Sequence, residues 1–220
     1  MVGFDIAIDG PAGAGKSTIA KRIAAKKGMI YVDTGAMYRA MALYMLREHV
    51  DLSDAEEIAE KCEKAEITIK HEDGVQCVFL NGENVNDLIR TEEVSEAASK
   101  TSVVPAVRKK LVSLQQELAI VESVVMDGRD IGTKVLPNAR LKIFLTANTR
   151  VRARRRFDEL MAKGEKASLS DIEKEIKERD HRDSTREESP LVQAFDAVLI
   201  DTSDMTIDEV VDRIMSLITW

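Results

Sequence analysis

The 220-residue sequence is poor in the residues that most often hold metals or form cross-links, because it has only two cysteines and three histidines. Cys62 and Cys77 form no C-x-x-C pattern and have no histidine pair nearby. This spacing excludes the common zinc-site patterns and favours free thiols in a reducing compartment over a disulfide. The histidines lie in no recognisable motif, and we interpret His49, His71 and His181 as surface or framework residues.

Long apolar runs are absent as well. No stretch approaches the roughly 20 residues that a membrane-spanning helix requires, and the first residues lack the basic-then-apolar pattern of a secretory signal. Hydrophobic residues make up 44% and charged residues 32% of the chain, as in globular proteins with one substantial core. We therefore expect a cytoplasmic monomer that does not bind membranes, without internal repeats or low-complexity tracts.

Positive charge is in the minority, with 32 lysines and arginines against 39 aspartates and glutamates and a net charge of −7. This balance argues against a general attraction to nucleic acid. The arginines are nevertheless concentrated in two stretches, 150–156 and 179–186. We interpret such a concentration in an acidic chain as directed at a small anion.

A glycine-rich segment carries the strongest motif, because residues 10–18 match G-x-x-x-x-G-K-[ST] in full. A strand is expected before it, over 4–9, and a helix after it, over 17–27, which is the context that this phosphate-binding loop requires. Backbone N–H groups, the helix N-terminus and the Lys16 side chain would surround a phosphate, and the Ser17 hydroxyl would contact Mg²⁺. We predict that a nucleoside triphosphate binds at Gly10, Pro11, Ala12, Gly13, Ala14, Gly15, Lys16, Ser17 and Thr18.

Strands and helices alternate along most of the remaining chain. Helices are expected over 36–48 and 105–121, and strands over 29–32, 123–127, 141–145 and 197–201. With the first strand this pattern predicts an α/β fold of the P-loop NTPase type, a five-stranded parallel sheet flanked by helices. Asp9, Asp33 and Asp127 would then stand at the carboxyl ends of strands, where such sheets bind ligands. Ser53, followed by Glu56, predicts the N-cap of a further helix.

The segment 65–101 interrupts this alternation. Two β-rich runs, 67–69 and 75–80, are joined through Asp73-Gly74, and Asn81-Gly82 predicts a second turn before a short run around Val85. A short helix would end the segment near Thr101. We expect a single domain with a core of about 1–64 and 102–220, a small antiparallel insertion, and a helical lid at about 150–186.

A phosphate-binding loop alone does not distinguish a switch, a motor and a small-molecule kinase. The Asn/Thr-Lys-x-Asp motif of guanine-reading GTPases is absent, and a nucleic-acid translocase usually needs a longer chain. The arginines suit phosphoryl transfer between two phosphate groups, because each phosphate needs its own cationic clamp and arginine can donate two parallel hydrogen bonds. A phosphate acceptor is already a dianion at pH 7, so no general base is required.

Four further segments resemble the bacterial cytidylate kinase family, and the resemblance covers essentially the whole chain. They are Asp33-Thr34-Gly35-Ala36-Met37-Tyr38-Arg39, Ile89-Arg90-Thr91 with Ala97-Ala98-Ser99, Asp127-Gly128-Arg129-Asp130-Ile131-Gly132-Thr133, and Lys177-Glu178-Arg179-Asp180 through Asp183 and Arg186. The resemblance implies transfer of the γ-phosphoryl group of ATP to CMP or dCMP, with Mg²⁺ as cofactor and segment 65–101 within the acceptor-binding lobe.

The resemblance also implies roles for individual residues. Substrate binding would fall to Thr34, Arg39, Ser99, Arg108, Arg129, Asp130, Arg179, Asp183 and Arg186, of which Ser99, Arg108 and Asp130 would read the cytosine and Asp183 the ribose hydroxyls. The catalytic residues would be Lys16, Arg129, Arg155, Arg179 and Arg186, and the metal ligand would be Ser17. Asp33 and Asp127 stay open as alternatives for orienting the waters of Mg²⁺.

Within the stretch 150–156, only Arg152, Arg155 and Arg156 match the lid of the family, and Arg150 and Arg154 are expected to be solvated. Two other functions stay open. One is a kinase of the same fold with another acceptor, such as UMP, which competition between CMP and UMP would reveal. The other is a regulatory or RNA-binding module without transfer activity, whose ATP turnover would not depend on an added acceptor.

Overall fold

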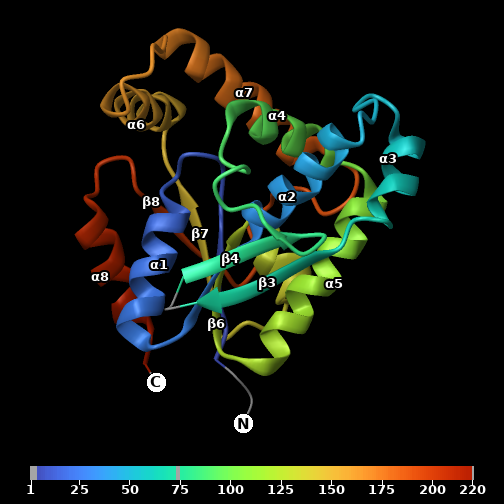
Figure 1. Ribbon diagram of the computed structural model, residues 1–220. Coiled ribbons are helices and arrows are strands. Elements are labelled where there is room, and N and C mark those ends of the chain that lie inside the picture. The colour runs from blue at the N-terminus through green and yellow to red at the C-terminus, as the bar shows by residue number, and fades with distance from the viewer. Residues whose placement is uncertain (1–3, 73–74, 220) are drawn as a thin grey trace.

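A five-stranded parallel sheet forms the centre of the computed structural model, which describes residues 4–72 and 75–219 (Figure 1). Its strand order is β2-β6-β1-β7-β8, and every pair of neighbours is parallel. The strands are β1 (Ile6–Asp9), β2 (Ile30–Asp33), β6 (Val124–Gly128), β7 (Leu141–Thr146) and β8 (Val198–Asp201). All five expected strands are present, and the predicted fold class is confirmed.

Helices cover both faces of this sheet because the side chains of each buried strand alternate between two cores. Ile6 and Ile8 of β1 pack with α1 (Lys16–Lys27) and α8 (Ile207–Leu217). Ala7, between them, belongs to the opposite core with α5 (Pro105–Val121). Both cores lie below the carboxyl ends of the strands, so those ends are available for a site.

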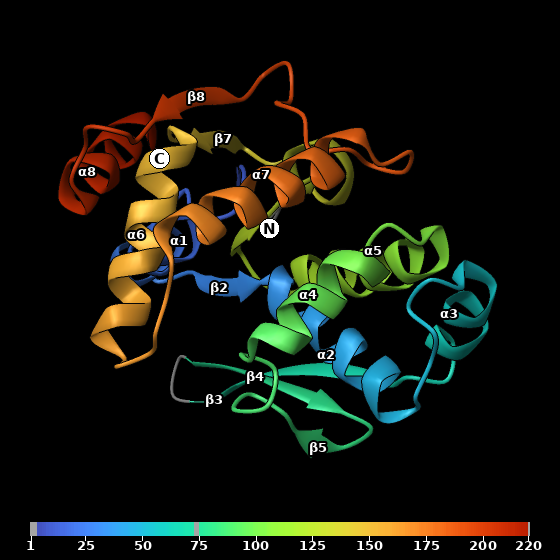
Figure 2. The ribbon, with the colours of Figure 1, turned by 90° about the horizontal axis from the view of Figure 1, so that it is seen from above.

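The insertion forms a second, antiparallel sheet of β3 (Ile67–Glu72), β4 (Val75–Leu80) and β5 (Glu83–Asn84). It packs against α2 (Thr34–Arg47), α3 (Ala55–Cys62) and α4 (Glu92–Thr101) on one side of the molecule (Figure 2). The first predicted turn, Asp73-Gly74, lies outside the described residues. At the second, Asn81 and Gly82 have φ angles of 49° and 83°, as a two-residue hairpin turn requires.

Two more helices, α6 (Thr149–Ala162) and α7 (Leu169–Thr185), lie beyond the carboxyl ends of the strands (Figure 1). They pack on each other through a small apolar cluster that includes Ala153, Ile172 and Ile176. A single turn of π-helix, η1 (Ile131–Val135), follows β6. No helix in residues 4–72 and 75–219 combines the length and the apolar composition needed to cross a membrane.

The predicted N-cap at Ser53 is wrong. The cap of α3 is Asp54, whose carboxylate accepts hydrogen bonds from the backbone N–H groups of Glu56 and Glu57. The hydroxyl of Ser53 instead donates to the carboxylate of Asp51, 2.7 Å away. Serine and aspartate are both good N-cap residues, so the sequence alone does not distinguish Ser53 from Asp54. In the structure the hydroxyl of Ser53 is bonded to Asp51, and Asp54 caps the helix.

Candidate nucleotide and phosphate site

The glycine-rich loop joins β1 to α1, and its backbone conformation requires glycine at several positions. Gly10, Gly13 and Gly15 all have positive φ angles, and a Cβ atom on Gly10 would lie only 2.0 Å from the carbonyl oxygen of Leu145. Gly15 precedes α1 without a side chain that caps the helix. The N-terminus of α1 therefore presents backbone N–H groups and its positive dipole end to a ligand.

Lys16 lies over this loop and is almost completely buried. Its Nζ atom donates to the carbonyl oxygen of Pro11 at 2.8 Å. Burial, and then the nearby Arg129, lowers the pKa of Lys16 to about 7, whereas Asp127 acts in the opposite direction. An anion bound to the loop would raise this pKa again, because a negative charge favours the ammonium form.

The first turn of α1 meets the end of β6 at Asp127. The Ser17 hydroxyl donates to Asp127 Oδ2 at 2.9 Å, and the Tyr31 hydroxyl donates to Oδ1 at 2.7 Å. Asp33, next to Asp127 in the parallel register, has different contacts: its carboxylate caps α2 at Ala36 and pairs with an arginine of the same helix. Asp127, and not Asp33, thus contacts the serine of the loop.

Five arginines, which we call the arginine cluster, gather beside this loop from four parts of the chain. Arg129 donates from Nε to Asp183 Oδ2 at 2.7 Å, and Arg108 pairs with buried Asp130. The nearby positive charges also influence one another, because burial and then Arg129 lower the pKa of Arg179 to about 10. The cluster consists of Arg39 from α2, Arg108 from α5, Arg129 after β6, and Arg179 and Arg186 from α7 and the residue that follows it.

The arginine cluster has more hydrogen-bond donors than the protein satisfies. Four of its nitrogen atoms are buried and, within the described residues, have no hydrogen-bond partner: Arg39 Nε, Arg108 Nε, Arg179 Nε and Arg186 Nη2. Buried donors without partners are rare in proteins and cost free energy. They are expected where a ligand supplies the acceptors, and an anion with several oxygen atoms fits best.

Two other predicted binding residues, Thr34 and Ser99, lie near this cluster and have partners within the protein. Thr34 donates from Oγ1 to the main-chain carbonyl of Asp127 at 2.7 Å, which ties α2 to β6. Ser99 on α4 accepts a hydrogen bond from Arg182 Nε at 3.2 Å. Thr18 is exposed on the first turn of α1. The structure therefore brings the predicted residues of the loop and of the arginine cluster to one end of the sheet.

The arginines of α6 differ from one another in their surroundings. Arg155 donates to the hydroxyl and carbonyl oxygens of Thr202, away from the arginine cluster. Arg154 and Arg156 are exposed and pair with Asp158 and Glu159 of their own helix. Arg150 is exposed too. Of these described arginines, Arg152 alone is buried, and it donates to the carbonyl oxygen of Ala12 in the loop.

Sequence reasoning did not assign a role to Asp9, at the end of β1. Its two carboxylate oxygens accept from the backbone N–H groups of Ile131 and Gly132, at 2.8 and 2.7 Å. Burial raises the pKa of Asp9 to about 6, against the effect of these two hydrogen bonds. Asp9 thereby fixes the segment that carries Arg129 and Asp130. The sequence feature that could have pointed to this role was the position of Asp9 at the end of a predicted strand.

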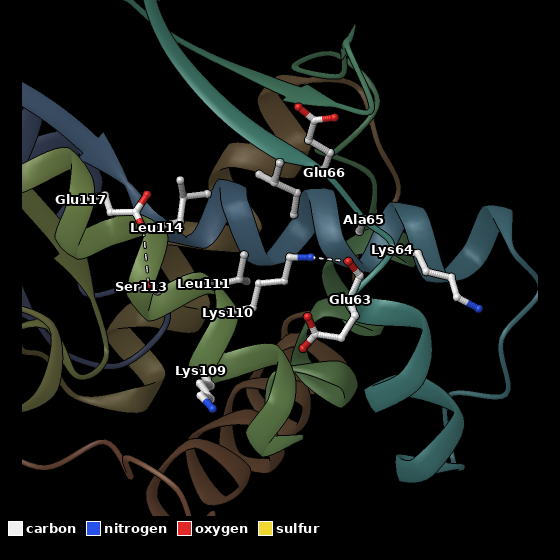
Figure 3. A pocket seen from close by; sticks show the side chains of 11 residues that line it. Glu63, Lys64, Ala65, Glu66, Lys109, Lys110, Leu111, Ser113, Leu114 and Glu117 are labelled. Carbon is white, nitrogen blue, oxygen red and sulfur yellow. Dashed lines mark hydrogen bonds between the residues drawn. The ribbon is translucent and has the colours of Figure 1, made fainter.

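A hollow of about 620 Å³, lined by α5 and by residues 63–67 at the start of the insertion, is not this site (Figure 3). Figure 3 shows Lys110 directed at the main chain before β3, where its Nζ atom donates to the carbonyl oxygens of Cys62 and Glu63. No buried polar atom without a partner lies among the described residues that line it. The hollow therefore lacks the unsatisfied charge that marks the arginine cluster.

Comparison with known proteins gives a family and two near relatives. The family model described as cytidylate kinase matches residues 6–220. A cytidylate kinase from Lactobacillus gasseri is 51% identical over 215 residues, which cover 98% of this chain and 94% of the relative. A cytidylate kinase from Desulfitobacterium hafniense is 53% identical over 214 residues, which cover 97% and 92%.

Solved structures support the fold at lower similarity. A gluconokinase from Sinorhizobium meliloti superposes with a TM-score of 0.50 at 15% identity, over 98% of this chain and 91% of that one. At this identity the likeness concerns the fold alone.

Proposed function

The chain belongs to the cytidylate kinase family, and from this we propose that it transfers the γ-phosphoryl group of ATP to CMP or dCMP. The observation that supports this most directly is the excess of buried guanidinium donors in the arginine cluster. The α-phosphate of CMP offers three oxygen atoms and about two negative charges at pH 7. It would satisfy donors of Arg39, Arg179 and Arg186 that have no hydrogen-bond partner in the protein, and the dianion would attack without a general base.

The donor would bind to the glycine-rich loop. Lys16 would leave the carbonyl of Pro11 and contact the β- and γ-phosphates, together with the N–H groups at the start of α1. Arg129, Arg179 and Arg186 would surround the transferred group and the acceptor. We retain Arg155 as a lid residue that would have to leave Thr202 when the nucleotides bind.

Mg²⁺ fits the chemistry of the contact between α1 and β6. Ser17 Oγ and Asp127 Oδ2 lie 2.9 Å apart and are both hard oxygen ligands. Ser17 would contact the ion and Asp127 would orient its water, while Asp33 stays with α2. Among the described residues no group of three or more His, Cys, Asp or Glu side chains could hold a metal ion by itself, and an ion that arrives with a nucleotide needs only one or two protein groups. When bound, it would neutralise charge on the phosphates.

The base would be read by Asp130 and Arg108, which already form a buried ion pair. A carboxylate can accept from the exocyclic amine of cytosine, and a guanidinium can donate to its O2/N3 edge. Uracil reverses part of this pattern and would leave buried groups unpaired. Ser99 would assist at this edge and Asp183 would hold the ribose hydroxyls.

An ADP-release assay with ATP and Mg²⁺ tests the proposal, with CMP, dCMP, UMP and AMP offered separately. We expect turnover with CMP and dCMP and little with UMP. Lys16→Ala should abolish turnover with every acceptor, whereas Asp130→Ala should lower kcat/KM for CMP by on the order of a hundredfold. ADP release that needs no acceptor would contradict phosphoryl transfer to CMP. Unchanged CMP kinetics in Asp130→Ala would contradict the assignment of the base site.

The proposal includes a cytoplasmic monomer whose partners are these small molecules, without nucleic acid or membrane. The net charge of −7 supports the absence of nucleic acid. Sedimentation of the purified protein at assay concentration tests the monomer.

A further inference from the structure

The outer edge of β2 is closed by two side chains from the inserted sheet. β2 is the last strand on its side of the parallel sheet, and its inner edge pairs with β6. Because backbone groups alternate in direction along a strand, Tyr31 and Asp33 turn their N–H and C=O groups outward. Such groups need partners when another part of the chain covers them.

Gln76 of β4 supplies both partners for Asp33. Its Oε1 atom accepts from the backbone N–H of Asp33 at 2.7 Å, and its Nε2 atom donates to the Asp33 carbonyl at 3.1 Å. The side-chain amide therefore reproduces the two hydrogen bonds of a neighbouring strand residue. The main chain of Gln76 is part of the inserted sheet, where its carbonyl accepts from Asn86 Nδ2 at 3.2 Å.

His71 of β3 supplies the partner for Tyr31. Its Nε2 atom lies 3.1 Å from the carbonyl oxygen of Tyr31. A carbonyl oxygen can only accept, so this nitrogen donates and carries the proton. His71 and Gln76 stand directly opposite each other in the register of β3 and β4. One cross-strand pair of side chains thus attaches the inserted sheet to two successive outward-facing positions of β2.

The two residues that are held in this way both contact the candidate site. Asp33 accepts from the N–H of Ala36 and pairs with Arg39 Nη2 at 3.0 Å, so it fixes both the start of α2 and one guanidinium of the arginine cluster. Tyr31 donates from its hydroxyl to Asp127. A displacement of the end of β2 would therefore move Arg39, whose Nε atom is buried without a partner.

We propose that Gln76, with His71 beside it, is a positioning residue for the acceptor phosphate: it holds the main chain of Asp33, and Asp33 orients Arg39. The inference rests on the proposed function, since it takes the CMP phosphate as the ligand of Arg39. Gln76 does not touch the nucleotide in this scheme. No hydrogen bond or ion pair joins Gln76, Asp33 or Arg39 to the glycine-rich loop or Lys16 among the described residues, so the effect of Gln76 belongs to the acceptor and not to ATP.

Gln76→Met tests this role because methionine keeps the length of the side chain and removes both hydrogen bonds. We expect the KM for CMP to rise about tenfold while the KM for ATP stays within about twofold of the wild-type value. The wild-type protein is assayed first. A wild type without CMP-dependent ADP release would refute the proposed function, whereas an active wild type with an unaffected Gln76→Met variant would refute this inference alone.

Asn86→Leu is the matched control for stability. Asn86 also makes two amide hydrogen bonds to main chain, to Val78 and Gln76, but both lie inside the insertion. We expect both variants to lose thermal stability, and only Gln76→Met to change the KM for CMP. An equal rise in that KM in Asn86→Leu would show that general loosening of the insertion, not the hold on Asp33, causes the effect.

A double-mutant cycle tests the route through Arg39. If Gln76 acts by orienting that guanidinium, Gln76→Met should change the KM for CMP by less than about twofold once Arg39 is replaced by Ala. A full tenfold effect in the Arg39→Ala background would overturn the proposed route.

Discussion

Asp9 shows how one carboxylate can determine the geometry of a neighbouring segment. It accepts from two successive backbone N–H groups of η1 and so fixes the position of Arg129 and Asp130 just before it. In Asp9→Asn, one acceptor oxygen becomes an NH₂ group that faces an N–H donor. We expect kcat/KM for CMP to fall about tenfold or more, with the secondary structure retained in circular dichroism.

Asp5→Asn is the control for this variant. Asp5 accepts from the backbone N–H of Val124 near the start of β1, at the end of the sheet away from the site. We expect its kinetics to match those of the wild type. An equal loss of kcat/KM in both variants would show that Asp9 stabilises the fold as a whole and does not specifically position the segment after β6.

If Lys16 contacts the polyphosphate as proposed, nucleotide binding should depend on pH. The pKa of Lys16 is about 7 in the free protein, and a bound polyphosphate raises it, so above pH 7 the complex holds a proton that the free protein lacks. The affinity for MgATP should therefore fall as the pH rises above 7. Calorimetry at pH 8 in buffers of different ionisation enthalpy should show uptake of about one proton.

Lys16→Arg provides the comparison for this measurement, since arginine keeps its charge throughout the pH range. Proton uptake at pH 8 should disappear in this variant. Equal uptake in both proteins would assign the proton to another group and contradict the lowered pKa of Lys16.

At the scale of elements, Arg152 connects α6, α7 and the glycine-rich loop. Its nitrogens donate to the carbonyls of Ala12 and Ala147, the hydroxyl of Thr149 and both oxygens of Asp180. All five N–H groups of the guanidinium thus have a partner within the protein. Arg152 therefore acts as a fixed connection in this structure, whereas the sequence matched it to lid arginines that would close over a ligand.

Breaking this connection should cost stability. Asp180→Asn leaves the guanidinium of Arg152, whose side chain is only 4% exposed, without its charged partner. We expect the free energy of unfolding in urea to fall by about 3 kcal/mol. Asp158→Asn breaks the exposed pair with Arg154 on the same helix and should cost less than about 0.5 kcal/mol. Similar losses in the two variants would contradict the difference in burial.

The sequence predicted those elements that local patterns determine. The glycine-rich loop, the five strands and the turn at Asn81-Gly82 follow from spacing within a few residues. The N-cap at Ser53 was wrong because Asp54 beside it is an equally good cap. His71 was interpreted as incidental, yet it contacts Tyr31, 40 positions away. Contacts of that kind have no period or spacing in the sequence, so only the folded chain reveals them.

At the scale of the whole molecule, the arginine cluster joins parts that are distant in the chain. Its members come from α2, α5, the segment after β6, and α7 with the residue that follows it, and they repel one another while no anion binds. An acceptor phosphate should therefore stabilise the fold as a whole. CMP at one hundred times its Kd should add about 2.7 kcal/mol to the free energy of unfolding.

Thermal unfolding with CMP and with cytidine distinguishes the stabilisation due to the phosphate from the stabilisation due to the base and sugar. We expect CMP to raise the Tm and cytidine, at the same concentration, to have little effect. Arg179→Met should reduce the shift that CMP produces. An equal shift with cytidine would place the main stabilising contacts at the base and contradict the role of the cluster.

The way in which the inserted sheet meets β2 also bears on the solubility of the protein. A bare strand edge can template pairing with a strand of another chain and so begin aggregation. Here the N–H of Asp33 and the carbonyls of Tyr31 and Asp33 are occupied by the side chains of Gln76 and His71. Because side chains and not a continuous strand cover the edge, the sheet does not extend into the insertion. The insertion thus protects this edge from intermolecular β-sheet growth while it remains a separate sheet.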